Sequence, residues 1–186
     1  MNKSKKFFSK LISGGGILFD LSKWIILAVV VLLLVTRFLI TIFIVDGESM
    51  EPNLHDKEAV LLQINSYNNS DPIRGDVVVV RYPGDPDNKK YVKRVIGLPG
   101  ETIELKNGKV YVDGKLVDEK YLSYSVKSEP SKVDLTTWRL SATEYFLMGD
   151  NRPFSNDSRY FGPVEKRFFD GRAISIIFPQ IRSIKK

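Results

Sequence analysis

A single serine, Ser49, stands in the polar stretch "VDGESMEPNLHD" directly after a long apolar run. A serine that attacks a carbonyl carbon needs a base, and the usual base is a histidine oriented by a carboxylate. The only histidine of the 186-residue chain is His55, six residues further along the same stretch. A histidine so near on the same turn seldom faces the serine. We therefore favour a solvated loop histidine and keep His55 open as an alternative base.

A lysine is the other base that serine peptidases use. A free lysine has a pKa of about 10.4, so it accepts a proton near neutral pH only when burial lowers that value by several units. Such a lysine should lie on a rigid, apolar strand. Lys93 meets this condition, because it stands in "YVKRVIGLP" between Val92 and Val95. Taken alone, a lysine in a strand is more often an exposed one.

A third stretch, "GDNRPFSNDSRYFGPV" at 149–164, gathers two aspartates, two arginines and two serines directly after the apolar "YFLM". It can be read as a polar surface loop. An adjoining apolar strand would anchor it, however, and the Ser155 hydroxyl could then accept a hydrogen bond from a neutral lysine. An aspartate–arginine pair would make the loop rigid.

The elements that must position these residues begin with an apolar run, "WIILAVVVLLLVTRFLITIFIV", from Trp24 to Val45. As a helix it would be roughly 33 Å long, enough for a bilayer core of about 30 Å. Its one charge, Arg37, is best placed near the far interface, with "FLITIFIV" partly leaving the bilayer as a strand. A cleavable signal peptide would have a shorter apolar region and a small-x-small site, which "TRFLITIFIVDG" lacks.

Lysines dominate the segment before the run, which predicts a cytoplasmic N-terminus and an extracytoplasmic body. These lysines are Lys3, Lys5, Lys6, Lys10 and Lys23, against one acid, Asp20. The expected organisation is a basic tail at 1–23, an anchor and exit strand at 24–45, and an extracytoplasmic domain at 46–186. The net charge of +6 then suits anionic lipid headgroups, and no basic helix or aromatic-interleaved patch indicates nucleic-acid binding.

The body after the anchor is predicted to be mainly β. "GDVVVVRY" at 75–82 is a dense β-branched run, and "KYVKRVIGLPGETIEL" at 90–105 gives two strands separated by a turn. Asn107-Gly108 and Asp113-Gly114 are tight-hairpin signals. "TEYFLMGDN" and "GRAISIIFP" add two more strands. With no cysteine and one histidine, the chain offers no disulfide, thiol nucleophile or clustered-histidine metal site, so we expect no cofactor and no metal.

Four blocks together resemble the bacterial type I signal peptidases, membrane-anchored Ser–Lys enzymes that remove signal peptides from exported proteins. The blocks stand in family order behind one N-terminal span. They are "GESMEPNL" (47–54), "RGDVVVV" (74–80), "KRVIGLPGE" (93–101) and "GDNRPFSNDSRYFG" (149–162). The compact middle resembles the Gram-positive form. The resemblance implies a compact sheet or barrel-like peptidase body on a single transmembrane helix.

The resemblance also implies roles for particular residues. Ser49 would be the nucleophile, with its backbone N–H in the oxyanion hole, and Lys93 the general base. Ser155 would position the lysine amine, and Asp157 and Arg159 would form a structural ion pair. Met50 and Pro52 would shape the nucleophile loop.

Three positions depart from the family pattern. Gly47 stands where some members have a second oxyanion donor, a side-chain hydroxyl, so that donor would have to be backbone or water. Asn53 replaces a commoner threonine, and Glu101 a common aspartate. Neither of these last two touches the expected proton path, and both leave open how closely substrate preference follows that of the family.

The resemblance implies that the partners are signal peptides of exported preproteins and the lipid bilayer, with the secretion translocon as a further one. Because a signal peptide lies in the bilayer, an anchor three residues ahead of Ser49 would hold catalyst and cleavage site at one depth. Two alternatives stay open: an anchored binding module without turnover, and a related peptidase for one dedicated secreted substrate. A self-cleaving repressor is disfavoured, because a membrane span stands where its DNA-binding segment would be.

Overall fold

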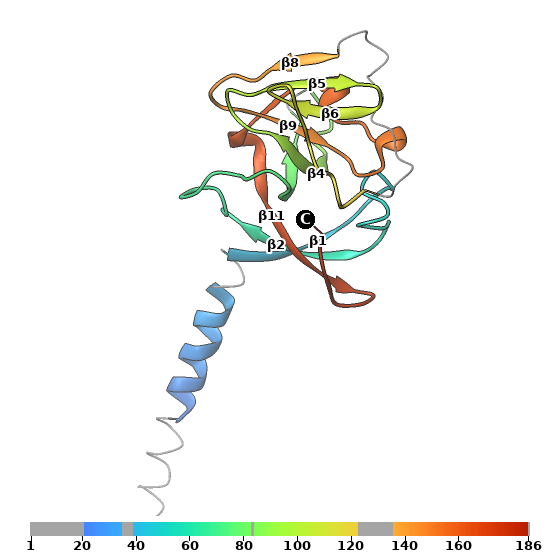
Figure 1. The fold of residues 1–186 in the computed structure, drawn as a ribbon. Coiled ribbons are helices and arrows are strands. Elements are labelled where there is room, and N and C mark those ends of the chain that lie inside the picture. The colour runs from blue at the N-terminus through green and yellow to red at the C-terminus, as the bar shows by residue number, and fades with distance from the viewer. Residues whose placement is uncertain (1–20, 35–38, 83, 123–135, 186) are drawn as a thin grey trace, which may run out of the picture. The chain divides into compact units, whose positions relative to one another are not determined.

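The computed structural model describes residues 21–34, 39–82, 84–122 and 136–185. The chain divides into two compact units, Met1–Ile40 and Thr41–Lys186. In the first unit, residues 21–34 form an α-helix whose large apolar side chains are exposed (Figure 1). Over the four described ranges, no helix has the length and apolar character needed to cross a membrane. Arg37, Asp20 and the lysines at 3, 5, 6 and 10 lie outside the described residues.

The apolar run ends in a strand, because Ile40–Ile44 form β1. Three of these five residues are isoleucine and one is threonine, and β-branched side chains favour strands over helices. The exit strand expected within "FLITIFIV" is therefore present.

The second unit is built from short strands with few helical turns. Its further elements are β2 (Ala59–Ile64), β3 (Val77–Arg81), β4 (Lys90–Gly97), β5 (Thr102–Lys106), β6 (Lys109–Val112), β7 (Lys115–Leu116), β8 (Thr137–Arg139), β9 (Glu144–Met148), η1 (Arg152–Phe154), α2 (Ser158–Phe161), β10 (Val164–Glu165), η2 (Lys166–Phe168), β11 (Phe169–Phe178) and β12 (Arg182–Ser183).

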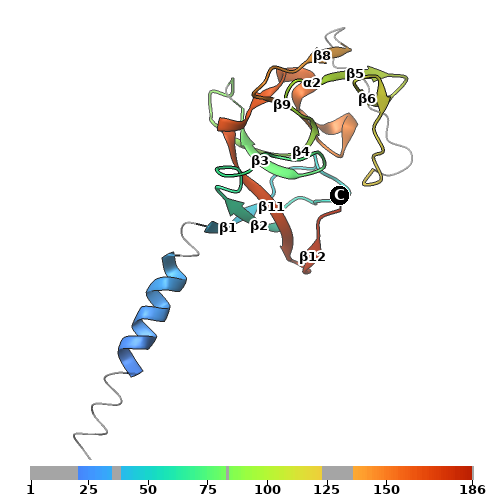
Figure 2. The same cartoon turned by 60° about the vertical axis from the view of Figure 1, so that its left-hand side comes forward.

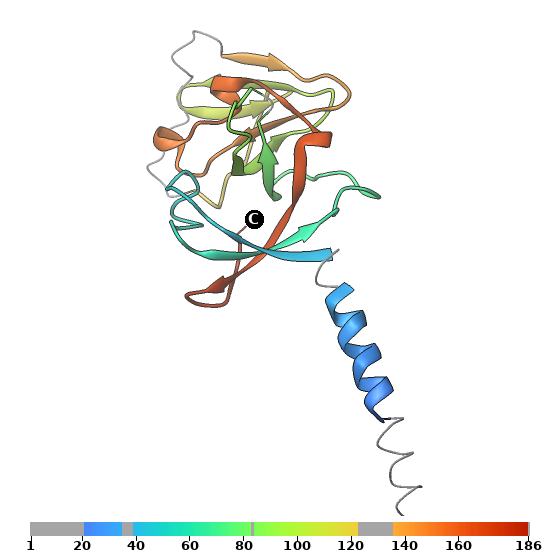
Figure 3. The same cartoon turned by 180° about the vertical axis from the view of Figure 1, so that it is seen from behind.

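Two sheets organise these strands. The larger has the order β1-β2-β11-β3-β4-β9-β10, with β12 paired to β11, and the smaller has the order β7-β6-β5-β8. Figures 1 and 3 show β5, β6 and β8 gathered at one end of the unit, and β1, β2 and β11 at the other. Strands β4 and β9 lie between these ends (Figure 2). The strand that carries Lys93 is thus interior, paired with β3 on one side and β9 on the other.

The valine run of β3 is buried on both faces. Val77 and Val79 pack in one apolar cluster with Met50, while Val78 and Val80 pack in another. Successive side chains of a strand point to opposite faces, so a strand covered on both sides needs an unbroken apolar run rather than an alternating one. This burial explains the four consecutive valines.

Both predicted hairpins of the smaller sheet are confirmed. Asn107 and Gly108 have φ values of 52° and 72° between β5 and β6. Asp113 and Gly114 have φ values of 49° and 74° between β6 and β7. Asparagine, aspartate and glycine tolerate positive φ, which two-residue hairpin turns of this type require.

The prediction of a mainly β body is confirmed, but its barrel-like form is not found as a closed barrel. In the described part of the chain, β1 and β10 are the edge strands of the larger sheet, and they are not hydrogen-bonded to each other. The result is two open antiparallel sheets, and Lys93 lies on a central strand of the larger one.

Candidate active site

Ser49 lies in the turn that follows β1. The N–H groups of Asn53 and Leu54 donate to the Met50 carbonyl oxygen at 3.0 and 2.9 Å. Met50 and Leu54 are 1% and 0% exposed, so they fasten both sides of the turn to the core. Pro52 lies exposed between them, after a cis peptide bond.

Gly47 begins the same turn. Its φ of 95° falls where only glycine is readily accommodated. Its N–H donates to Asp56 Oδ1 at 2.7 Å and so joins the two ends of the turn. The Lys57 ammonium pairs with Asp46 and also with Asp56 Oδ1, which lies 3.3 Å away. The segment 46–57, which we call the nucleophile loop, is thus joined where it starts and ends by charged groups.

Lys93 reaches Ser49 directly. Lys93 Nζ and Ser49 Oγ are 2.7 Å apart, and Nζ also donates to the Val92 carbonyl oxygen at 3.0 Å. The lysine is 2% exposed. Burial lowers the pKa of Lys93 to about 8, because an ammonium ion is poorly solvated there. The charges of Asp157 and Asp150 oppose that shift and Arg159 adds to it.

A base with a pKa near 8 suits a serine peptidase that works around neutral pH. At pH 8 about half of the Lys93 amines would be neutral, and a neutral amine accepts the Ser49 hydroxyl proton. The pair therefore has both the geometry and the proton affinity that general-base catalysis requires.

Ser155 follows η1 and is 4% exposed. Its Oγ has no hydrogen-bond partner within the described residues, so the expected bond to Lys93 is not formed there. It does lie in the site: the two atoms nearest to a Cβ added at Gly149 would be Ser155 Oγ and the Ser49 carbonyl oxygen. Gly149 is glycine because a side chain would collide with both.

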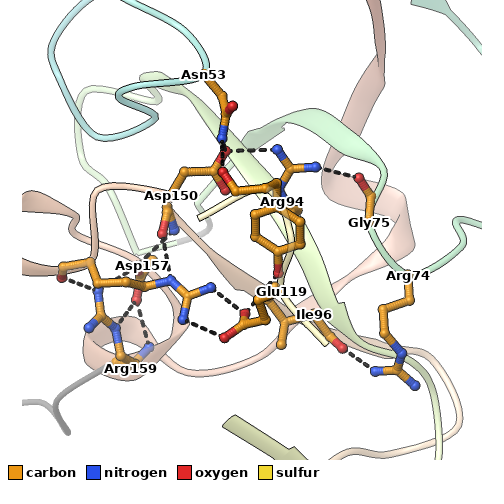
Figure 4. Close-up of polar contacts among 12 residues, drawn as sticks. Asn53, Arg74, Gly75, Arg94, Ile96, Glu119, Asp150, Asp157 and Arg159 are labelled. Carbon is orange, nitrogen blue, oxygen red and sulfur yellow. Dashed lines mark hydrogen bonds and ion pairs between the residues drawn. The ribbon is translucent and has the colours of Figure 1, made fainter. Parts of the chain in front are cut away.

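Asp157 and Arg159 form a bidentate ion pair at 2.8 and 2.9 Å, and both are buried. Asp157 also accepts the Gly149 N–H at 3.0 Å, and Arg159 Nη2 donates to the Arg152 carbonyl oxygen at 2.6 Å. The pair, labelled in Figure 4, holds the loop between β9 and α2 in one shape, and this loop carries Ser155.

A second buried ion pair was not predicted. Arg94 Nε and Nη2 donate to the two carboxylate oxygens of Asp150 at 2.8 and 2.7 Å (Figure 4). Arg94 is 0% exposed, and its guanidinium also lies 3.9 Å from the Tyr121 ring centroid. The only hint in the sequence is an arginine directly after Lys93 in an apolar strand.

A cleft of about 360 Å³ opens beside the Ser49–Lys93 pair. One wall comes from the end of β1 and the turn after it, and the other from the start of β4. Its lining includes Phe43, Ile44, Val45, Met50, Tyr91 and Val92, besides the pair itself. Asp46, Lys89 and Lys90 add charged groups to the lining. An extended peptide would therefore meet both apolar and charged side chains beside Ser49 and Lys93.

His55 lies away from this pair. Its side chain is 51% exposed, and Nδ1 faces Glu51 Oε1 at 3.4 Å. In the ranges that the structure covers, it makes no hydrogen bond to Ser49. The site geometry therefore favours a lysine base over the histidine alternative.

Comparisons with known proteins point to one family. The chain matches the family model described as "Signal peptidase, peptidase S26" over residues 18–178. A signal peptidase I of Bacillus amyloliquefaciens is 40% identical over 174 residues, which are 89% of this chain and 92% of that protein. Signal peptidase IB of Staphylococcus aureus is 35% identical over 176 residues, with 86% and 91% covered. A solved signal peptidase I of Enterococcus faecalis aligns at 30% identity with a TM-score of 0.46, covering 55% of this chain and 97% of that chain.

Proposed function

Because this chain belongs to the signal peptidase family, we propose that it cleaves preproteins with Ser49 as the nucleophile and Lys93 as the general base. Membership makes the chain a serine peptidase that removes signal peptides from preproteins. The assignment of the two catalytic residues is our own.

One observation carries that assignment: the 2.7 Å contact between Lys93 Nζ and Ser49 Oγ, with the lysine 2% exposed. A nucleophile and its base must lie within hydrogen-bond reach, and the base must lose its proton near the working pH. Burial supplies the second condition by lowering the pKa of Lys93 to about 8.

In the proposed reaction, the preprotein lies extended in the cleft beside β1 and β4. Ser49 Oγ bonds to the carbonyl carbon of the scissile peptide while Lys93 Nζ takes the hydroxyl proton. Lys93 then gives this proton to the leaving amine as the peptide C–N bond breaks. The acyl group of the signal peptide stays on Ser49, and the mature protein departs with a new N-terminus.

Water completes the cycle. Lys93 takes a proton from a water molecule that attacks the acyl-enzyme, and the proton returns to Ser49 Oγ as the ester breaks. We assign Ser155 to orienting the Lys93 amine through its buried hydroxyl. The Asp157–Arg159 pair would keep that hydroxyl in place.

The backbone N–H of Ser49 is the proposed oxyanion donor. It meets no hydrogen-bond acceptor among the described residues, so it is available to a developing oxyanion. Gly47 bears no hydroxyl, and its N–H already donates to Asp56. A second donor would therefore be another backbone group or water. Met50 and Pro52 are proposed to shape the loop that aims the Ser49 N–H.

We also propose that the chain is a single-pass membrane protein with a cytoplasmic N-terminus and an extracytoplasmic catalytic body. The apolar run from Trp24 and the lysines before it support this orientation. The exposed apolar side chains of the helix at 21–34 support it too, since lipid is a suitable solvent for them. The lipid bilayer and the secretion translocon would then be partners of the enzyme.

The test is cleavage of a secretory preprotein by the detergent-solubilised full chain, followed by sequencing of the product's new N-terminus. We expect cleavage after a small-x-small site, abolished in Ser49→Ala and Lys93→Ala variants that fold normally. Cleavage that survives Lys93→Ala and is lost in His55→Ala would refute the Ser–Lys assignment. A folded wild type that cleaves one secreted protein and no other would favour the dedicated-substrate alternative.

A further inference from the structure

Asn53 lies four residues after Ser49 and is 2% exposed. Its side-chain amide donates from Nδ2 to Asp150 Oδ2 and to the Tyr121 carbonyl oxygen, both at 2.8 Å. Both partners are acceptors, so only a group with two N–H or O–H donors satisfies them together. A threonine, with one hydroxyl proton, could donate to only one of these two acceptors.

The backbone of Asn53 is held as firmly as its side chain. Its N–H donates to the Met50 carbonyl oxygen at 3.0 Å, and its own carbonyl oxygen accepts from Arg182 Nη1 at 2.8 Å. Arg182 in turn pairs with Glu58 through two contacts of 2.8 Å. Asn53 is therefore a fixed point at the downstream end of the nucleophile loop.

Asp150 connects Asn53 to β4, the strand that contains Lys93. The carboxylate receives both the Asn53 amide and the Arg94 guanidinium, as Figure 4 shows. Arg94 directly follows Lys93 in β4, and its Nη1 donates to the Gly75 and Lys185 carbonyl oxygens at 2.9 and 2.8 Å. The Arg94 guanidinium thus donates hydrogen bonds to the Asp150 carboxylate and to two backbone carbonyl oxygens. It cannot move without breaking these bonds.

Asn151, the residue after Asp150, binds the nucleophile loop near Ser49. The Asn151 N–H donates to the Ser49 carbonyl oxygen, and Asn151 Nδ2 donates to the Glu48 carbonyl oxygen, both at 3.0 Å. Asp150 and Asn151 together therefore hold the nucleophile loop both at Ser49 and, through the Asp150 carboxylate and Asn53, four residues later.

We propose that Asn53 is a positioning residue of the peptidase, whose buried amide joins the nucleophile loop to Asp150 and Arg94 and so sets the Ser49–Lys93 geometry. The proposal rests on the proposed function above. Within the described residues, Asn53 makes no hydrogen bond to Ser49 or Lys93 and does not line the cleft. Its effect should therefore fall on the chemical step and leave substrate binding nearly unchanged.

The same arrangement gives Asn53 an electrostatic effect on the base. The negative charge of Asp150 favours the ammonium form of Lys93. The Asn53 N–H group points its positive end at that carboxylate and partly offsets its field. Without the amide, the pKa of Lys93 should move upward, and activity should need a higher pH.

The test compares Asn53→Leu, which keeps the side-chain size but has no donor, with Asn69→Leu, the same change at an exposed asparagine. In the full chain, Asn53→Leu should lower kcat by about tenfold to a hundredfold, as expected for a small misplacement of reacting groups. KM should stay within about twofold, and the rising limb of the pH profile should move to higher pH. Asn69→Leu should change none of these. Asn53→Thr, with one donor, should give an intermediate kcat and is the test variant if the leucine variant does not fold.

A wild-type kcat and pH profile in a folded Asn53 variant would overturn the proposal. So would a loss of activity that matches the unfolded fraction, with the profile of the folded fraction unchanged. Amide hydrogen exchange at 48–51 provides a readout without substrate, and loss of the Asn53 amide should speed it by about tenfold. If the wild type cleaves no preprotein, the proposed function fails and this exchange rate alone decides the role of Asn53.

Discussion

Replacing Lys93 by methionine should make the protein more stable at neutral pH while abolishing its activity. Lys93 is almost fully buried, and its pKa falls from 10.5 to about 8 because the ammonium ion loses solvation. A pKa shift of this size means that burying the ammonium ion destabilises the folded state by about 3 kcal/mol. Methionine has a similar length and no charge, so the variant avoids that cost.

The sign of the effect follows from proton binding. Between about pH 8 and pH 10.5 the unfolded chain keeps the lysine proton that the folded chain has released. The free energy of unfolding of the wild type therefore rises with pH across this window, as far as Lys93 is concerned. Below pH 8 the full cost is present, and above 10.5 it has disappeared.

Lost hydrogen bonds offset part of the gain. The methionine variant leaves the Val92 carbonyl oxygen and Ser49 Oγ without the amine, at about 0.5–1.5 kcal/mol for each bond. The expected net gain at pH 7 is thus about 1–2 kcal/mol, or roughly 3–6 °C in Tm. The advantage should shrink, and then reverse, as pH rises from 8 to 10.5.

The assay is thermal unfolding of the full chain in detergent, monitored by circular dichroism at several pH values. Lys90→Met is the matched control: Lys90 lies on the same strand, but its side chain is half exposed and pairs with Asp170 at 3.0 Å. That change should alter stability by less than about 1 kcal/mol. A Lys93→Met variant that is less stable than the wild type at pH 7, by an amount independent of pH, would refute the reasoning.

Three further changes test the loops around the pair. Gly149→Ala should lower kcat/KM by at least about tenfold, because the added methyl group would displace Ser155 and the Ser49 backbone; a wild-type value would contradict this packing. Asp157→Asn should cost about 3–5 kcal/mol in chemical unfolding by leaving a buried Arg159 without its counter-ion, and a loss below 1 kcal/mol would show that the pair is dispensable. Arg94→Lys should cost at least about 2 kcal/mol in the same assay, because an ammonium group cannot reproduce the bidentate bond to Asp150 together with the two bonds to carbonyl oxygens.

Local signals in the sequence account for most of the strands. The valine run of β3 and the Asn-Gly and Asp-Gly turns act over a few residues, so their structure follows from conformational preference. Strand β2, Ala59–Ile64, was not predicted. It lies between polar loops, and its pairing with β11 depends on contacts more than a hundred residues away in sequence.

The candidate site divides in the same way. Ser49 and Lys93 stand out as candidates by residue type and neighbours, but their roles follow from the resemblance of four sequence blocks to the signal peptidases. The Arg94–Asp150 pair and the role of Asn53 could not, since they join positions 56 and 97 residues apart. Nothing in the sequence around Asn53 distinguishes a buried amide from a polar loop residue until the fold brings Asp150 beside it.

The most direct test of the Ser–Lys assignment is the pH dependence of kcat/KM for preprotein cleavage by the full chain. The neutral lysine is the active form, so activity should rise with pH to a plateau, with a midpoint near 8. At pH 6 the rate should be about a hundredfold below that plateau. His55→Ala should leave this profile unchanged. Activity that is lost in His55→Ala while Lys93→Ala keeps it would contradict the account and assign the base to the histidine.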